Sequence, residues 1–153
     1  MFQLPFPVHD VNASSGSKDL GDLPEWDLSD LYSSQDAPEL SRDLQWLDQE
    51  CASFAADYEG KLAHLDAEEM LNCVLRNERI NTIAGRIMSF AGLRYYQLTT
   101  DSGRAKFLSD MQEKITNFTT PLVFFTLELN KLPDDHLDTL LHQNPDLARY
   151  KPV

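Results

Sequence analysis

Four histidines and two cysteines are the residues of this sequence best suited to metal or nucleophilic chemistry. Zinc peptidase chemistry on a helix usually needs two histidines four residues apart, with a glutamate beside the first to activate water. No pair among the four histidines has that spacing, and the acidic residues around His136 predict a helix start in place of a metal site. A di-iron bundle needs glutamate three residues before histidine, and positions 61, 133 and 139 are lysine, proline and threonine. The histidines are His9, His64, His136 and His142.

Nucleophilic and phosphate-binding motifs are missing as well. No serine lies in a nucleophile elbow, and no glycine-rich loop follows a strand. Cys51 and Cys73 are far apart within segments that are predicted to be helical, and Cys51 continues an apolar stripe. We therefore expect buried, reduced thiols instead of a disulfide, a metal ligand or a nucleophile, in a reducing compartment. The sequence assigns no catalytic, cofactor-binding or metal-ligating residue.

Composition limits the class of protein. A chain of 153 residues with 42% hydrophobic residues fits one domain with a core of its own. The formal net charge of −12 argues against nucleic acid or an anionic membrane as a partner, because those surfaces are bound mainly through lysine and arginine. The acidic excess fits a basic ligand or, more commonly, solubility. No secretory signal or membrane-length apolar run is evident, so we expect a cytoplasmic protein.

The longest apolar pattern lies in residues 102–130, where spacings of three and four alternate. This alternation places the apolar side chains on one stripe of a helix, which indicates packing against other helices. Pro121 lies inside the pattern and cannot donate a backbone hydrogen bond, so we predict a kink or short break near Thr119 and Thr120. The stripe consists of Leu108, Met111, Ile115, Phe118, Leu122, Phe125 and Leu129.

A second apolar stripe predicts a helix over residues 36–59. Asp36 is a suitable N-cap, with Glu39 three residues later to complete a capping box, and Gly60 is a natural stop. The apolar residues again alternate spacings of four and three. They are Leu40, Leu44, Leu47, Cys51, Phe54 and Tyr58.

The helix predicted for residues 66–98 begins with a similar cap, Asp66 followed by Glu69. Its apolar face also carries Asn77 and Arg94, and a polar group in such a place costs roughly 1 to 3 kcal/mol unless it finds a partner. We expect Arg94 to form a salt bridge with one of the many carboxylates; the alternative is a role in binding a substrate carboxylate. Asn77 is expected to mark a local bend.

Two glycines in this helix, Gly85 and Gly92, lie on nearly the same face. Each costs the helix about 1 kcal/mol relative to alanine. We expect close approach of a neighbouring helix to offset this cost; a ligand groove is the alternative.

The segment before the first helix contains Trp26, Leu28, Leu31 and Tyr32, which are expected to clamp an extended strap onto the helices. An exposed tryptophan docking site is the alternative. Together these patterns predict an all-α fold, an antiparallel bundle of long helices. The predicted helices span about 36–59, 66–98, 102–130 and 133–142, in a domain of residues 23–153 that follows a flexible tail of residues 1–22.

Four segments, in this order, resemble a known family. They are LPEWDLSDLY (23–32), DYEGKL (57–62), GLRYYQLTTD (92–101) and FFTLELNKLPDD (124–135). The chain is similar here to the N-terminal helical region of the oligoendopeptidase F group, in the thimet oligopeptidase family of zinc peptidases. The similarity covers about residues 23–153, and no single segment is a catalytic signature.

The resemblance implies an all-helical metalloendopeptidase that hydrolyses short peptides. Its zinc would be held by an HExxH motif and a further glutamate downstream of this chain, while the N-terminal helices form one wall of a channel that admits oligopeptides. The partner would be the protein's own C-terminal catalytic domain, and this chain alone would be inactive. A homodimer of the isolated chain is a further possible assembly, because a domain separated from its catalytic half exposes an apolar face. Whether Arg94, Tyr95 and Tyr96 face the channel stays open. The alternative is a free-standing helical protein-interaction module without enzymatic activity.

Overall fold

The computed structural model describes residues 26–151, and all regular secondary structure in that range is helical. The all-α prediction is therefore confirmed for these residues, whereas the tail predicted for residues 1–22 lies outside them. None of the helices between residues 26 and 151 combines the length and the apolar character that crossing a membrane requires. The elements are α1 (Pro38–Tyr58), η1 (Leu62–His64), α2 (Ala67–Gln97), α3 (Ser102–Thr119), η2 (Thr120–Leu122), α4 (Val123–Leu129), α5 (Asp134–Gln143) and α6 (Pro145–Ala148).

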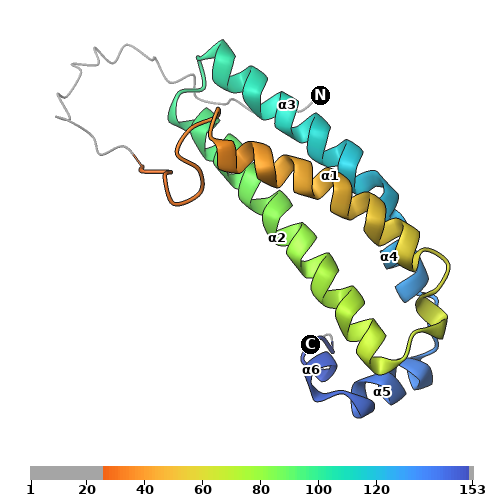
Figure 1. Ribbon diagram of the computed structural model, residues 1–153. Helices are drawn as coiled ribbons and strands as arrows, with labels where there is room; N and C mark the ends of the chain where they lie inside the picture. Colours follow the sequence, from red (N-terminus) through yellow and green to blue (C-terminus); the bar gives the residue numbers. More distant parts are fainter. Residues whose placement is uncertain (1–25, 152–153) are drawn as a thin grey trace, which may run out of the picture.

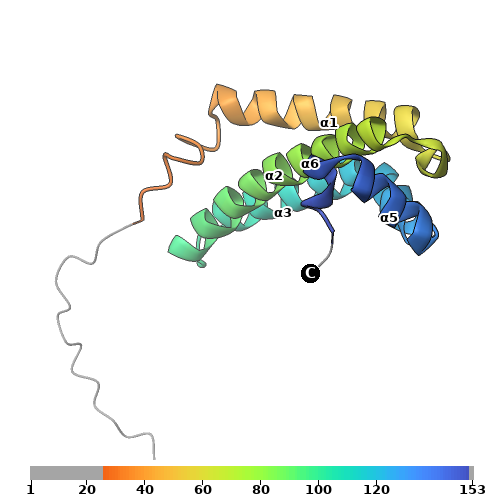
Figure 2. The same ribbon diagram turned by 90° about the horizontal axis from the view of Figure 1, so that it is seen from below.

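The long helix α2 occupies the centre of the arrangement. It contacts both α1 and α3, and α1 also contacts α3 and η2. In Figure 1, α2 runs in the opposite direction to α1 and α3. The short helices α5 and α6 pack against α2 and lie near its first turns, as the view from below in Figure 2 also shows.

The start of α1 differs from the prediction. Ala37 is the N-cap residue, no side chain caps the helix, and Pro38 is its first residue. Because proline favours the first helical position, the cap must fall at residue 37, and Asp36 is one residue too early. The predicted capping box of Asp36 and Glu39 is therefore wrong. The end of α1 agrees with the prediction, since Gly60 directly after the C-cap residue has a φ of 77°, a conformation that glycine adopts without strain.

The predicted cap of α2 is confirmed. The Asp66 carboxylate accepts hydrogen bonds from the backbone N–H groups of Glu68 and Glu69, each at 2.9 Å. The Glu69 carboxylate accepts from the N–H of Asp66 at 3.0 Å, which completes a capping box. Asp101 is the N-cap residue of α3, and its carboxylate accepts hydrogen bonds from the backbone N–H groups of Gly103 and Arg104 at 2.8 and 3.1 Å. The helix α2 continues without interruption through Asn77.

The break predicted near Pro121 is also confirmed, because α3 ends at Thr119 and a 3₁₀ turn separates it from α4. A 3₁₀ turn rotates the chain more per residue than an α-helix, so it shifts which side chains face inward. As a result Phe124 joins Phe125 in the core, although the sequence pattern included only Phe125.

Two hydrophobic clusters stabilise the fold. The main cluster joins α1, α2, α3 and α4, and its centre is the ring of Phe54, whose centroid lies 4.9 to 5.9 Å from three other rings. The predicted stripes of α1 and α3 pack into this cluster. A smaller cluster joins the start of α2 to α5 and α6 and contains Ala67, Met70, Leu132, Leu140 and Leu147.

Candidate functional site

The end of α2 holds Arg94, for which a salt bridge was predicted. Within residues 26–151 Arg94 makes no ion pair, and its buried Nε has no hydrogen-bond partner. Its carbonyl oxygen accepts a hydrogen bond from Arg104 Nη1 at 3.0 Å. The acidic residue of this junction, Asp101, is already engaged, since it caps α3 and lies 3.8 Å from Arg104 Nε. The predicted salt bridge of Arg94 is therefore wrong for the part of the chain that the structure describes.

Aromatic side chains are exposed beside Arg94. The rings of Tyr95 and Tyr96 lie 5.5 Å apart, and Tyr96 is 70% exposed. The side chain of Gln97 donates a hydrogen bond to the carbonyl oxygen of Trp26 at 2.9 Å, which attaches the strap to α2 and leaves Trp26 67% exposed. The prediction that Trp26 packs onto the helices is therefore wrong.

Among the described residues, no neighbouring helix comes close to Gly85 or Gly92 of α2. A Cβ atom at Gly85 would meet no heavy atom within 4 Å, and at Gly92 it would meet only the ring of Tyr96, at 3.9 Å, in the same helix. The predicted close approach of a neighbouring helix is wrong within residues 26–151, because α1 and α3 cover other faces of α2.

The remainder of the strap is held by Tyr32, which is 2% exposed. Its hydroxyl donates to Asp43 Oδ2 at 2.6 Å, and the guanidinium of Arg86 lies 4.4 Å from the centroid of its ring. Arg86 also donates to the carbonyl oxygen of Leu31. These contacts bind the strap to both α1 and α2, as the clamp prediction requires. Leu28 and Leu31 pack against the same core.

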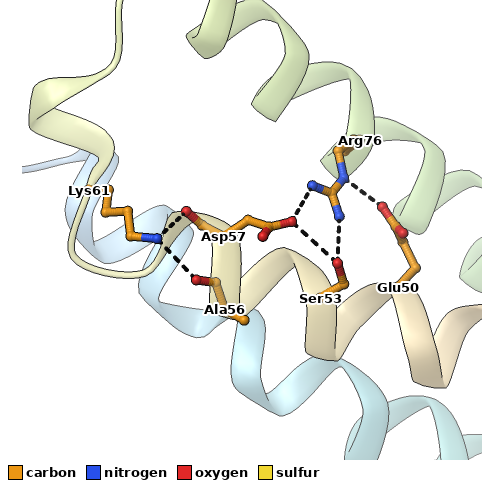
Figure 3. A network of polar contacts seen from close by, with 6 residues as sticks. All are labelled: Glu50, Ser53, Ala56, Asp57, Lys61 and Arg76. Carbon is orange, nitrogen blue, oxygen red and sulfur yellow. Dashed lines mark hydrogen bonds and ion pairs between the residues drawn. The ribbon is translucent and has the colours of Figure 1, made fainter.

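A polar network joins α1 and α2 at their other end (Figure 3). Arg76 lies 2.7 Å from Glu50 and 2.8 Å from Asp57, and it donates to Ser53 at 3.3 Å. Its guanidinium also lies 5.7 Å from the centroid of the Phe54 ring. Partial burial acts to lower the pKa of Arg76, but its hydrogen bonds to Glu50 and Asp57 outweigh this effect, and the pKa lies above its ordinary value.

Sequence reasoning missed this network. The residues that α1 contributes to the network can be found in the sequence, because Glu50, Ser53 and Asp57 lie on one face of α1 at helical spacing. The cation that they share comes from another helix, and only the packing of α2 on α1 brings it there. We interpret the network as structural, since all three nitrogens of the Arg76 guanidinium are paired with groups of α1.

Both cysteines are free and buried, as predicted. Burial, together with the nearby charge of Glu50, raises the pKa of Cys51 to about 11. Burial raises the pKa of Cys73 to about 12. The thiolate is the reactive form of cysteine, so neither side chain is suited to act as a nucleophile near neutral pH.

His136 lies in the first turn of α5, after Asp134 and Asp135, in agreement with the predicted acidic helix start. Its Nε2 atom is buried without a hydrogen-bond partner among the described residues. Between residues 26 and 151, no three side chains of the metal-binding types lie close enough together to hold an ion.

A cavity of about 430 Å³ lies where α2, α4, α5 and α6 meet. Asn77, Asn130 and Asp134 contribute polar groups to its lining, together with Tyr150 and Lys151 near the end of the described chain. Its walls are otherwise mostly apolar and include Met70, Val74, Phe125, Leu137, Leu140 and Leu147. This combination of an apolar interior and a few polar groups is typical of ligand-binding sites.

Comparisons of this chain with protein-family models, with curated proteins and with solved structures find no match. The resemblance to the oligoendopeptidase F group therefore depends on the four segments described above.

Proposed function

We propose that this chain is the N-terminal helical domain of a zinc-dependent oligoendopeptidase, in which it forms one wall of a substrate channel and restricts the size of the peptides that enter. The observation that supports the proposal is the place of the four family-like segments in the fold. The first segment precedes α1, and each of the other three includes the connection between one helical element and the next. All four supply contacts that fix these places in the fold.

The first segment is the strap, which is held through Tyr32. The second contains the turn after α1, with Gly60 in its left-handed conformation. The third ends in Asp101, the N-cap residue of α3. The fourth begins with Phe124 and Phe125, which are buried against Phe54. Segments that determine a helical layout are expected to be shared by proteins with the same layout, and this supports the proposed relationship.

Under the proposal, the zinc ligands of the parent enzyme lie outside this chain. Zinc sites need three or four histidine, cysteine or carboxylate ligands around one point, and residues 26–151 do not supply such a set. In the parent enzyme, zinc would activate a water molecule for attack on a peptide bond. The helices described here would contribute shape: a rigid wall and exposed side chains such as Tyr96 along it.

An assay of peptide hydrolysis by the purified chain tests whether the catalytic chemistry lies outside it. We expect no cleavage of an unstructured, internally quenched oligopeptide by the 153-residue chain, with or without added zinc. Cleavage that a chelator abolishes and zinc restores would show that the chemistry resides in this chain and would refute the proposal.

The second candidate is a free-standing helical interaction module, which would use the apolar side chains that α4 leaves in solvent to bind a partner helix. Val123 is 59% exposed and Leu127, one turn later, is 55% exposed. Light scattering after size exclusion discriminates between the candidates. A monomer favours a complete module, whereas a homodimer that covers this face favours a domain separated from its catalytic half.

A further inference from the structure

Arg94 continues the buried stripe of α2 toward the end of that helix. Ala91, three residues earlier, is 0% exposed. Phe90, one turn before Arg94, is covered by Tyr32 of the strap and by Phe107 of α3, with ring centroids 5.4 and 6.0 Å away. Arg94 therefore lies at the end of the bundle, where the strap, α2 and α3 meet.

The guanidinium of Arg94 lacks an acceptor within residues 26–151. Its Nε atom is buried without a hydrogen-bond partner, and the side chain forms no ion pair in this range. A buried N–H group without an acceptor is unfavourable, and one that belongs to a cation is more so. Arg94 as a whole is only partly buried, so the described residues do not seal it inside the bundle.

The acidic side chains at this end of the bundle do not supply that acceptor. Asp101 caps α3 and lies 3.8 Å from Arg104 Nε. Asp27 and Asp30 of the strap are exposed, and neither forms an ion pair with Arg94 in the described range. Arg94 therefore remains available to an acceptor from outside these residues.

A carboxylate complements this site, because it can accept two parallel hydrogen bonds from one guanidinium. Exposed apolar side chains lie at the same end of α2. Leu98, one turn after Arg94, is 47% exposed, and Trp26, whose carbonyl oxygen is bonded to Gln97, is 67% exposed. A ligand that carries a carboxylate next to an apolar side chain fits this combination. The C-terminal residue of a peptide has both groups.

We propose that Arg94 binds the C-terminal carboxylate of an oligopeptide whose last side chain is apolar and packs against Leu98 and Trp26. The identity of this ligand rests on the proposed function, in which oligopeptides enter a channel beside these helices. Holding the C-terminus of the peptide at a fixed place limits the length of peptide that reaches the zinc. The wall thereby restricts substrate size through a specific contact.

The fluorescence of Trp26 in the full 153-residue chain tests the proposal. The chain contains two tryptophans, so Trp46→Phe leaves Trp26 as the reporter beside the site. The probes are acetyl-triglycyl-leucine with a free C-terminal carboxylate and the same peptide as its amide. We expect a saturable change with the free acid and binding that is weaker by about tenfold or more with the amide, because charge-assisted hydrogen bonds are lost. Serine in place of the leucine should also weaken binding.

Variants of the chain locate the site. Arg94→Gln removes the charge and is expected to weaken binding of the free acid by about tenfold or more, which abolishes the preference over the amide. Arg94→Lys keeps the charge without the planar fork and should retain only part of the affinity. Arg42→Gln, at an exposed position of α1, is the matched control, with affinity expected within about twofold of the parent. Circular dichroism checks that each variant is folded.

Several results would overturn the proposal. These are no saturable change, equal affinity for the acid and the amide, or equal effects of Arg94→Gln and Arg42→Gln. Tighter binding of the free acid after Glu25→Gln would assign Arg94 to a carboxylate of the chain itself and would also refute a peptide ligand. The proposed function is tested separately, by the sequence that follows Val153, so its failure is distinguishable from a failure of binding at Arg94.

Discussion

Tyr32 donates a hydrogen bond from its hydroxyl to Asp43 Oδ2 at 2.6 Å, and this bond attaches the strap before α1 to the helix that follows it. The ring of Tyr32 packs edge-on against Phe90 of α2, with the ring centroids 5.4 Å apart. One side chain of the strap thus contacts both of the first two long helices.

Tyr32→Phe removes the hydroxyl and keeps the ring. We expect the free energy of unfolding to fall by about 1 to 2 kcal/mol, because the bond is partly buried and its acceptor is a carboxylate. Urea unfolding followed by circular dichroism measures the change. Tyr96→Phe is the control, since the ring of Tyr96 is 70% exposed and a change within about 0.5 kcal/mol is expected. Equal effects of the two substitutions would contradict the role of Tyr32.

Tyr32 also makes the free energy of unfolding depend on pH in the alkaline range. Burial, and secondly the hydrogen bond to Asp43, raises the pKa of Tyr32 well above its ordinary value of 10.0. The unfolded chain loses this proton near pH 10 while the folded chain retains it, so the stabilisation is fully present below that pH and is lost as pH rises beyond it. Denaturant titrations across this window should show a steeper loss of stability for the parent than for Tyr32→Phe. Parallel curves would refute the assignment.

The thiols are expected to be unreactive in the folded chain. Cys51 and Cys73 are at most 1% exposed, and burial raises their pKa values to about 11 and about 12. A thiol-reactive dye at pH 8 should therefore label both cysteines in urea and neither under native conditions. Rapid native labelling of either residue would contradict the described packing.

Arg76→Ala removes the cation that joins α1 to α2. We expect a loss of about 2 kcal/mol of unfolding free energy, because hydrogen bonds between charged groups contribute more than neutral ones and solvent screening reduces their strength here. Arg42→Ala, at an exposed position of α1, is the control and should change stability by less than about 0.5 kcal/mol. Arg76→Lys should recover only part of the loss, since lysine lacks the planar fork. Full recovery by lysine would show that charge alone matters.

Alanine substitutions at Gly85 and Gly60 are expected to change stability in opposite directions. Gly85→Ala should stabilise the chain by about 1 kcal/mol, because the helix gains a better residue and nothing lies within 4 Å of the new methyl group. Gly60→Ala should destabilise it by about 1 to 2 kcal/mol, since φ is 77° there. Thermal melts of the two variants should shift in opposite directions, and a shared direction would contradict the backbone description.

Local signals in the sequence predicted much of the fold. The cap at Asp66 and the break at Pro121 depend only on residues within one or two turns, and both are confirmed. The cap predicted at Asp36 is wrong because Pro38 fixes the start of α1 by its own geometry.

Features that depend on packing could not be predicted in this way. The partners of Arg76 lie on another helix, and the burial of Phe124 follows from the 3₁₀ turn before it. The expected contacts of Arg94 and Gly85 are wrong because helical spacing identifies a face but does not say which neighbour covers it. The cavity likewise depends on how α5 and α6 fold back against α2, which no periodicity encodes.

The reading frame that follows the codon for Val153 is the most direct test of the proposed function. We predict that it continues in frame and encodes an HExxH motif with a further glutamate, on segments that are themselves helical. A stop codon at that point, with no such motif downstream, would contradict the assignment of this chain to a zinc oligoendopeptidase.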